Sequence, residues 1–361
     1  MNLHADVCIV GGGPAGSLLG HLLAKNGVST VIIERSAGVN RQFRGEHINA
    51  ETEAILKEHQ LFKKIEELGL LKMKKVEYFA GKKIVNSISP GDHEDHVGIH
   101  VPQAHLLSAI IQESEANKNF QLLFNTTVKE LIQDENGFYS GVKAIQNGEE
   151  IHISSKVTIG ADGRYSTVRK LANIPTIEMT HGYDVLWAKI PAPAGWQPTT
   201  RMVLVNGHQL ALFTQTGGFI QIGWNIPEGS FPTLRKGSLQ PYLEPLIDSF
   251  PELKAGVSEN LRSWNDFVCL KVQSSRSETW VKDGLILIGD AAHTMTPTGA
   301  IGINCGMKDA HVLAPILTKA IIENDISAVQ LKTFEMSRKN EIKTQQLMQL
   351  KQETSFAEKF A

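Results

Sequence analysis

Short apolar segments alternate with segments of helical spacing along most of the chain. Short continuous apolar runs are typical of strands buried in a parallel sheet. The predicted strands of this kind are residues 5–10, 30–33, 121–124, 141–145, 156–159 and 284–288. Apolar residues that recur at helical spacing predict helices over residues 17–24, about 50–68, 106–111 and 302–312. This alternation of strand and helix predicts an α/β fold.

The pattern changes between about Met179 and Cys269. Short alternating runs broken by Pro and Gly predict an antiparallel sheet, with strands at 185–190, 202–205, 210–213 and 219–222. We therefore predict a discontinuous nucleotide-binding domain of residues 1–73, 98–178 and 270–322, and a substrate-binding domain of residues 74–97 and 179–269. Residues 323–361 form a helical C-terminal segment rich in Lys, Gln and Glu, which predicts a solvated packing helix.

Composition excludes several classes of protein. The 361 residues are 42% hydrophobic and 20% charged, and the net charge of −2 argues against a nucleic-acid partner. Cys8, Cys269 and Cys305 are scattered without disulfide or metal spacing, which predicts a reducing, cytoplasmic location. No run reaches the roughly 18 apolar residues of a membrane helix, so we expect no integral membrane segment. The pattern leaves a monomer or a homodimer open.

A glycine-rich motif at residues 11–16 follows the first predicted strand directly. Gly11 permits the tight turn, Gly13 lets the backbone approach a pyrophosphate, and Gly16 lets the next helix pack closely on the strand. Glu34 ends the second strand, at the distance where an acid usually binds the ribose hydroxyls. By itself this motif fits either NAD or FAD.

Two later motifs favour FAD. Gly160-Ala161-Asp162-Gly163 and Gly289-Asp290 each follow an apolar run, and the three motifs in this order indicate a flavin held at both ends. A helix that begins near residues 302–306 would present its N-terminal N–H groups to the flavin. The positive end of that helix would stabilise the negative charge of the reduced ring.

These motifs resemble the class A flavoprotein monooxygenases, the aromatic hydroxylase family that includes para-hydroxybenzoate hydroxylase, over roughly residues 3–320. Residues 162–169 match the family pattern Asp-Gly-x-x-Ser-x-x-Arg, which contacts FAD and NAD(P)H in that family. The resemblance implies a Rossmann-like, GR2-type FAD-binding domain interleaved with an antiparallel β-sheet substrate domain, plus a C-terminal helix. The implied cofactor-binding residues are Gly11, Gly13, Pro14, Ala15, Gly16, Glu34, Arg35, Arg44, Gln103, Val128, Asp162, Gly163, Arg169, Gly289, Asp290, Pro297, Gly302, Ile303 and Asn304.

The resemblance also implies a reaction. NADH or NADPH reduces FAD, dioxygen adds to give a flavin hydroperoxide, and the distal oxygen is transferred to an aromatic or polyketide-like small molecule. By the resemblance, Asp290 binds the ribityl chain, Pro297, Gly302 and Asn304 line the isoalloxazine ring, and Arg44 reaches the ribose and phosphate region. We predict that Trp187, Phe213 and Trp224 line the substrate pocket, while the residues that activate the substrate are not assigned.

Three alternatives remain open at this stage. Residues 222–227 match the end of the halogenase pattern Trp-x-Trp-x-Ile-Pro but carry Ile222 in place of its first tryptophan. A reductase of the geranylgeranyl type and a flavin-binding accessory protein without turnover also fit the late motif. The histidine-rich segment 92–100 matches no standard metal spacing, so we expect no metal site there or elsewhere.

Overall fold

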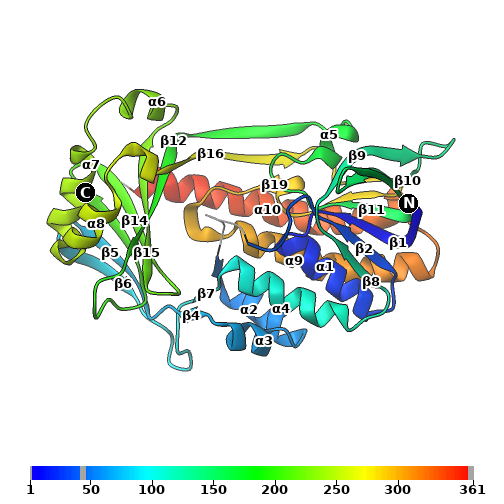
Figure 1. Cartoon of the computed structure of the whole chain (residues 1–361), viewed down its shortest axis with the longest axis horizontal. Coiled ribbons are helices and arrows are strands. Elements are labelled where there is room, and N and C mark those ends of the chain that lie inside the picture. The colour runs from blue at the N-terminus through cyan, green and yellow to red at the C-terminus, as the bar shows by residue number, and fades with distance from the viewer. Residues whose placement is uncertain (1, 41–45, 357–361) are drawn as a thin grey trace.

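The computed structural model describes residues 2–40 and 46–356 and contains two large sheets and one small sheet (Figure 1). The first sheet has a parallel core in the order β18-β11-β1-β2-β8. Its parallel strands are β1 (Asn2–Val10), β2 (Thr30–Ile33), β8 (Phe120–Leu123), β11 (Glu149–Gly160) and β18 (Leu285–Leu287). The antiparallel additions are β9 (Thr126–Gln133), β10 (Tyr139–Gln146) and β17 (Val281–Lys282).

Helix α1 (Pro14–Lys25) packs against β2 and lies beside α4 (Gln103–Glu115) and α9 (Gly302–Ile322). All four residues of β2 and the last four residues of β1 are buried, so both faces of these central strands are covered. This double coverage explains the continuous apolar runs in the sequence, because a strand buried on both faces has no polar face. The predicted α/β fold is confirmed.

The second sheet has the order β19-β16-β12-β15-β14-β13-β5-β6. Its strands are β5 (Lys75–Ala80), β6 (Lys83–Ile88), β12 (Thr176–Pro191), β13 (Thr199–Val205), β14 (His208–Gln215), β15 (Phe219–Pro227), β16 (Val268–Ser277) and β19 (His293–Thr294). All neighbours pair antiparallel except β13 and β5, which are parallel. Three helices that the alternating pattern did not predict, α6 (Phe231–Leu234), α7 (Gln240–Ser249) and α8 (Lys254–Asn260), lie beside this sheet.

A small three-stranded sheet and a broken helix lie between these parts. The strands are β3 (His47–Ile48), β4 (Leu71–Lys72) and β7 (Ile99–His100). The helical segment predicted over about residues 50–68 is present, but the chain divides it into two helices, α2 (Ala50–Glu58) and α3 (Phe62–Leu68). Gln60 has a φ of 65°, a left-handed conformation that ends one helix before the next begins.

The C-terminal helix α10 (Ala328–Phe356) packs beside α9 and β17. The predicted packing helix is present, and its packed face is more extensive than its polar composition indicated, since Leu331, Phe334 and Ile342 are buried. Polar side chains on the same helix are also buried, with Arg338 only 1% exposed and Gln346 and Gln349 each 2%. Apolar periodicity could not reveal this face because much of it is polar.

Long strands connect the two large sheets. Strands β12 and β16 run from the second sheet towards α5 (Thr167–Leu171) beside the first sheet (Figure 1). The domain boundaries predicted above stay a proposal. Among the described helices, none is long and apolar enough to cross a membrane.

Candidate functional site

The first two glycine motifs touch each other at the carboxyl ends of β1 and β11. The Gly11 N–H donates to the Ile33 carbonyl oxygen at 2.8 Å, which continues the pairing of β1 with β2 past Val10. A Cβ on Gly11 would lie 2.4 Å from the Ala161 carbonyl oxygen, and a Cβ on Gly16 would lie 2.0 Å from the Gly11 carbonyl oxygen. Neither position has space for a side chain, so the backbone itself forms this surface.

The third motif meets the first from the other side. A Cβ on Gly306 would lie 3.3 Å from the Ala15 Cβ and 3.4 Å from the Gly289 Cα. The start of α1, the turn at Gly289 and the first turns of α9 therefore pack with only small groups between them. Gly289 itself has a φ of 56°, which a side chain would strain. Pro14 begins α1 directly after Gly13, so the first N–H groups of the helix face the same turn.

Glu34 holds the glycine loop from the end of β2. Its carboxylate accepts the Gly12 N–H at 2.8 Å, and its other oxygen accepts the Ser36 N–H and hydroxyl, each at 2.9 Å. The neighbouring Arg35 is exposed. Val128 is buried on β9, which reaches Glu34 through a 2.8 Å hydrogen bond from the Thr126 N–H to the Glu34 carbonyl oxygen.

Asp162 caps the short helix α5. Its carboxylate accepts the Thr167 N–H at 2.6 Å, the Val168 N–H at 3.1 Å and the Ser166 hydroxyl at 2.5 Å. Burial raises the pKa of Asp162 even though these hydrogen bonds favour its ionised form. Gly163 follows with a φ of 84°, so it supplies the turn into the helix.

Arg169 links the middle motif to the late motif. Its guanidinium donates to the Ala291 carbonyl oxygen at 2.8 Å and to the Arg164 carbonyl oxygen at 2.9 Å. The side chain is buried, and burial lowers its pKa. Its described contacts are therefore with the protein backbone, and they fix the distance between residues 162–169 and the turn at Asp290.

The predicted ring-binding residues follow one another around a tight loop. Asp290 is half-buried in the turn Gly289–Ala291, and Pro297 precedes a turn in which Gly299 has a φ of 73°. Helix α9 begins at Gly302, and Ile303 is partly buried in its first turn. This loop connects the late motif to the start of the helix.

The Asn304 side chain joins the start of α9 to the segment before α2. Its amide nitrogen donates to the His47 carbonyl oxygen at 3.0 Å, and its amide oxygen accepts the Asn49 N–H at 3.1 Å. Asn49 also caps α2 by accepting the Thr52 N–H at 2.9 Å. The two helices are thus joined where they begin.

Helix α10 braces the loop around Pro297, which the sequence did not reveal. Glu353 accepts hydrogen bonds from the hydroxyls of Thr296 and Thr298, each at 2.7 Å. The Gln349 amide donates to the carbonyl oxygens of the same two threonines at 3.1 and 2.5 Å. These partners lie more than 50 positions away in the chain, beyond the reach of any local motif.

A buried ionic cluster lies behind the late motif. Asp309, fully buried on α9, accepts the Gly289 N–H at 2.9 Å and lies 2.6 Å from His293 Nε2 and 2.7 Å from Arg338 Nε. Burial opposes the ionised form, yet His293 and Arg338 hold the pKa of Asp309 below its usual value. The charge is therefore retained and fixes the turn that carries Asp290.

Polar side chains gather where the second sheet faces α4. Glu46 lies 2.8 Å from His100 Nε2, accepts the Gln103 N–H at 3.3 Å and accepts the Gln215 amide at 3.3 Å. The Gln215 amide also donates to Gln221. His100, Gln103 and Gln215 are buried. Of these residues the sequence indicated only Gln103 as part of a site, because the others come from separate elements.

Aromatic residues share that face of the second sheet. The rings of Trp187 on β12 and Phe213 on β14 have centroids 6.0 Å apart. A Cβ on Gly223, on the strand between them, would lie 2.7 Å from the Trp187 ring, so this glycine makes room for the indole. Phe213 and Gln215 are two positions apart on β14, so both point to this face.

Trp224 lies on the opposite face of the sheet. It is 1% exposed, its ring centroid is 5.3 Å from that of Phe267, and its indole N–H donates to the Tyr242 carbonyl oxygen at 3.2 Å. The structure therefore places Trp224 in the core under α7, apart from Trp187 and Phe213. Arg44, the remaining predicted cofactor residue, lies outside the described residues.

A cavity of about 260 Å³ opens beside the middle motif. Its lining includes Arg164, Arg169, Lys170, Glu178, Gln273 and Thr294. Three of these side chains are cationic and one is anionic, so the cavity carries an excess of positive charge. It lies on the side of Asp162 and α5 where the long strands β12 and β16 pass.

Comparison with known proteins identifies the family. The sequence profile of the FAD binding domain family matches residues 4–345. The chain is 33% identical over 337 residues to 6-methylpretetramide 4-monooxygenase from Streptomyces rimosus, covering 90% of this chain and 78% of that protein. Fold and site thus define a flavoprotein. The chain belongs to the FAD-binding domain family, of the aromatic hydroxylase type.

Solved structures share the fold across almost the whole chain. PqsL, a probable FAD-dependent monooxygenase from Pseudomonas aeruginosa, superposes with a TM-score of 0.84 at 18% identity and covers 99% of this chain and 98% of its own. The p-nitrophenol 4-monooxygenase PnpA from Pseudomonas putida DLL-E4 gives 0.79 at 20% identity, with coverages of 98% and 89%. The predicted GR2-type fold with interleaved sheets and a C-terminal helix is confirmed.

Proposed function

We propose that this chain is a single-component FAD-dependent monooxygenase that uses NAD(P)H and O2 to hydroxylate an aromatic or polyketide-like small molecule. The observation that carries the proposal is the meeting of three distant motifs. Backbone contacts bring Gly11, Ala161 and Gly289 around one set of turns at the carboxyl ends of parallel strands. That is where open α/β sheets bind their ligands. Similarity to a monooxygenase over most of both chains supports the same reaction class.

The residues present fit FAD. Gly11 and Gly16 let the loop and α1 pack closely on the neighbouring backbone. Gly13 would let the backbone approach a pyrophosphate, which the N–H groups at the start of α1 would bind. Glu34 would hold the adenosine ribose and Asp290 the ribityl chain. When bound, FAD would supply electron transfer and the activation of dioxygen.

The other residues assigned to the cofactor lie around the same proposed flavin site. Pro297, Gly302 and Asn304 would line the isoalloxazine ring, with the first turn of α9 directed at it. Gln103, beside Glu46, would contact the cofactor from α4. Asp162 and Arg169 would act mainly by fixing the loops around the site, since their described contacts are with neighbouring backbone groups and Ser166. The proposed set of cofactor-binding residues is completed by Arg35, Arg44, Val128, Gly163 and Ile303.

The substrate would bind against the face of the second sheet that carries Trp187 and Phe213. These two rings offer an apolar surface for a planar substrate. The linked side chains of Glu46, His100 and Gln215 lie on the same side and would orient a substrate hydroxyl by hydrogen bonding. Trp224 is left out of this pocket because it faces the core.

The cavity beside Arg164 and Lys170 would admit the nicotinamide donor. Its cationic side chains favour a pyrophosphate, and its position next to Asp162 lies close to the proposed flavin site. Glu178 is the one anionic side chain at its border. The choice between NADH and NADPH is left to measurement. A cytoplasmic location and a monomer or homodimer belong to the same proposal, supported by the free thiols of Cys8, Cys269 and Cys305.

Rapid mixing tests the proposed reaction class. Anaerobically reduced protein is mixed with oxygenated buffer while flavin absorbance is followed, in the presence and absence of aromatic ligands. A transient near-ultraviolet band before the oxidised flavin spectrum returns supports a monooxygenase. Direct return of the oxidised spectrum with every ligand contradicts it. A product that gains mass only with chloride would instead support the halogenase alternative, and oxygen-independent saturation of alkenes would support the reductase alternative.

Removal of the Asp290 carboxylate tests the cofactor assignment. Asp290→Ala should lower FAD affinity at least about tenfold, because a hydrogen-bonding partner of the ribityl chain is lost. The measurement is the fraction of flavin retained after gel filtration and its dissociation constant. Asp248→Ala, at an exposed position on α7, is the control and should retain FAD. Unchanged FAD affinity in Asp290→Ala would remove Asp290 from the site.

A further inference from the structure

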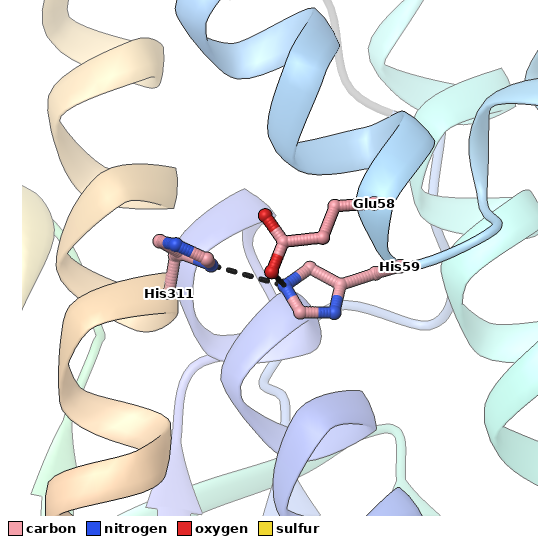
Figure 2. Close-up of side chains that lie close together, drawn as sticks. All are labelled: Glu58, His59 and His311. Atoms are coloured by element: carbon pink, nitrogen blue, oxygen red, sulfur yellow. Dashed lines mark hydrogen bonds and ion pairs between the residues drawn. The ribbon is translucent and has the colours of Figure 1, made fainter.

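Two histidines and a glutamate meet at the surface between α2 and α9 (Figure 2). Glu58 ends α2, His59 follows it, and His311 projects from the middle of α9 towards both. The three potential ligand atoms lie within 4.8 Å of one another. This group lies outside the histidine-rich segment 92–100, and the sequence concealed it because His59 and His311 are 252 positions apart.

The distances between the potential ligand atoms suit an ion with tetrahedral coordination. His59 Nε2 lies 3.0 Å from His311 Nδ1 and 4.0 Å from Glu58 Oε1. Ligand bonds of about 2.0–2.1 Å in a tetrahedral zinc site place neighbouring ligand atoms about 3.3 Å apart. The two measured separations fall on either side of that value, so rotation of the exposed Glu58 side chain would bring its oxygen into range.

His59 Nε2 and His311 Nδ1 share a hydrogen bond in which one ring donates to the other, and a bound metal ion would replace that hydrogen bond (Figure 2). A neutral imidazole is the form that binds a metal ion. Lys25 lies near enough to His59 to disfavour an added positive charge, and the Glu58 carboxylate offsets this effect.

We propose that Glu58, His59 and His311 bind a divalent transition-metal ion of the zinc type, with water as the fourth ligand. Two imidazoles and one carboxylate form a ligand set that zinc commonly takes, whereas calcium and magnesium prefer oxygen ligands. The proposal does not depend on the oxygenase reaction. It concerns a site that joins the end of α2 to the middle of α9.

The position of the site gives the ion a structural role. Helices α2 and α9 are already joined near their starts by the Asn49–Asn304 contact and further along by the 2.5 Å ion pair of Glu51 and Lys308. An ion at His59 and His311 would add a third connection, at the end of α2. Because Asn304 belongs to the proposed flavin site, the ion would limit movement of α2 relative to that site.

Calorimetry tests binding directly. FAD-loaded protein is treated with EDTA, separated from chelator and free flavin, and titrated with ZnCl2. We expect one saturable site that His59→Ala and His311→Ala each weaken at least about tenfold. His152→Ala is the matched control, since His152 pairs with Glu150 at 2.7 Å on β11. Binding that His59→Ala and His311→Ala weaken and that His152→Ala leaves unchanged supports the proposal. Absence of saturable binding by the wild-type protein overturns it.

Cobalt binding gives a second, spectroscopic measurement that does not depend on the heat of binding or on the stability of the protein. Co2+ bound by two imidazoles and a carboxylate in tetrahedral geometry should add visible d–d bands to the difference spectrum, and Glu58→Gln should weaken them. Circular dichroism and retained FAD confirm that each variant is folded. Equal Zn2+ affinity and equal Co2+ bands in folded His59→Ala and His311→Ala would assign the metal to other residues and overturn the proposal.

Discussion

Asp309 shows how one buried carboxylate can organise groups that are distant in the sequence. Its oxygens hold the Gly289 N–H, the His293 ring and the Arg338 guanidinium, from a turn, a strand and the C-terminal helix. A buried ion pair adds little net stability over an apolar replacement, but loss of one partner leaves an uncompensated charge. The cluster therefore fixes the late motif, and removal of one partner should lower the free energy of unfolding.

Asp309→Asn should lower the free energy of unfolding by about 3–5 kcal/mol, because His293 and Arg338 lose the buried anion they share and Arg338 keeps only the partly exposed Glu341 as a charged partner. Urea unfolding followed by circular dichroism gives the change. Asp325→Asn serves as the control, since Asp325 accepts hydrogen bonds from Ser327 at an exposed position and its neutralisation should cost under about 1 kcal/mol. Equal stability of the Asp309→Asn variant and the wild-type protein would show that the cluster is not coupled to folding.

At the scale of single residues, the sequence predicted backbone requirements and missed side-chain networks. Gly11 and Gly16 were identified from spacing, and the structure shows why no Cβ fits at either position. Glu353 and His100 were not identified, because their partners come from other elements and no local spacing encodes such contacts. Trp224 and Phe213 look alike on alternating strands, and only the register shows which face each occupies.

At the scale of elements, α10 is the least expected part of the molecule. Gln349 and Glu353 on this helix bond to the loop around Pro297, while the buried Arg338 bonds to Asp309 on α9. Glu353 also accepts the Tyr183 hydroxyl at 2.9 Å and lies 2.7 Å from His181 Nδ1 on β12. One side chain thus joins the helix, the loop and the second sheet.

Glu353→Gln should destabilise the protein by about 1–3 kcal/mol, because an amide cannot accept as many hydrogen bonds as the carboxylate from these partners. The loop around Pro297 should loosen, so flavin fluorescence and the rate of FAD release should rise. Thermal unfolding and flavin release are measured beside Glu259→Gln, an exposed exchange on α8. A flavin release rate equal in both variants would show that α10 does not brace the cofactor loop.

Secondary structure was predictable where periodicity was strong. The apolar strands β1, β2 and β18 and the helices α1 and α9 were found from their patterns. The break between α2 and α3 was missed because Gln60, a residue with no turn preference, adopts the left-handed conformation. Helices α6 to α8 were missed because the Pro and Gly residues of this region are also typical of the turns between short strands.

At the scale of the whole molecule, buried carboxylates make folding depend on pH. The ordinary pKa values of these groups are 3.8 for Asp309 and 4.5 for Glu353, and cationic or hydrogen-bonding partners lower both pKa values in the folded protein despite burial. The unfolded chain therefore binds protons more readily than the folded chain in acid. The stability these groups contribute is complete above about pH 5 and is lost as pH falls through their folded pKa values.

Urea unfolding at pH 7, 5, 4 and 3 should therefore show a nearly constant free energy of unfolding down to about pH 5 and a steep fall below it. Asp309→Asn should flatten this fall, since the variant lacks one of the titrating groups. A slope in acid that is the same in the variant and the wild-type protein would assign the pH dependence to other carboxylates.

The bracing of the loop around Pro297 by Glu353 has a consequence for synthesis. Thr296 and Glu353 are separated by 57 positions, and His181 and Glu353 by 172. A chain made from its N-terminus can complete the first glycine turn early, whereas the ring-side loop gains its braces only when α10 has been translated. During synthesis, the residues that would bind the adenosine end of FAD should therefore be in place before the loop that would line the isoalloxazine ring.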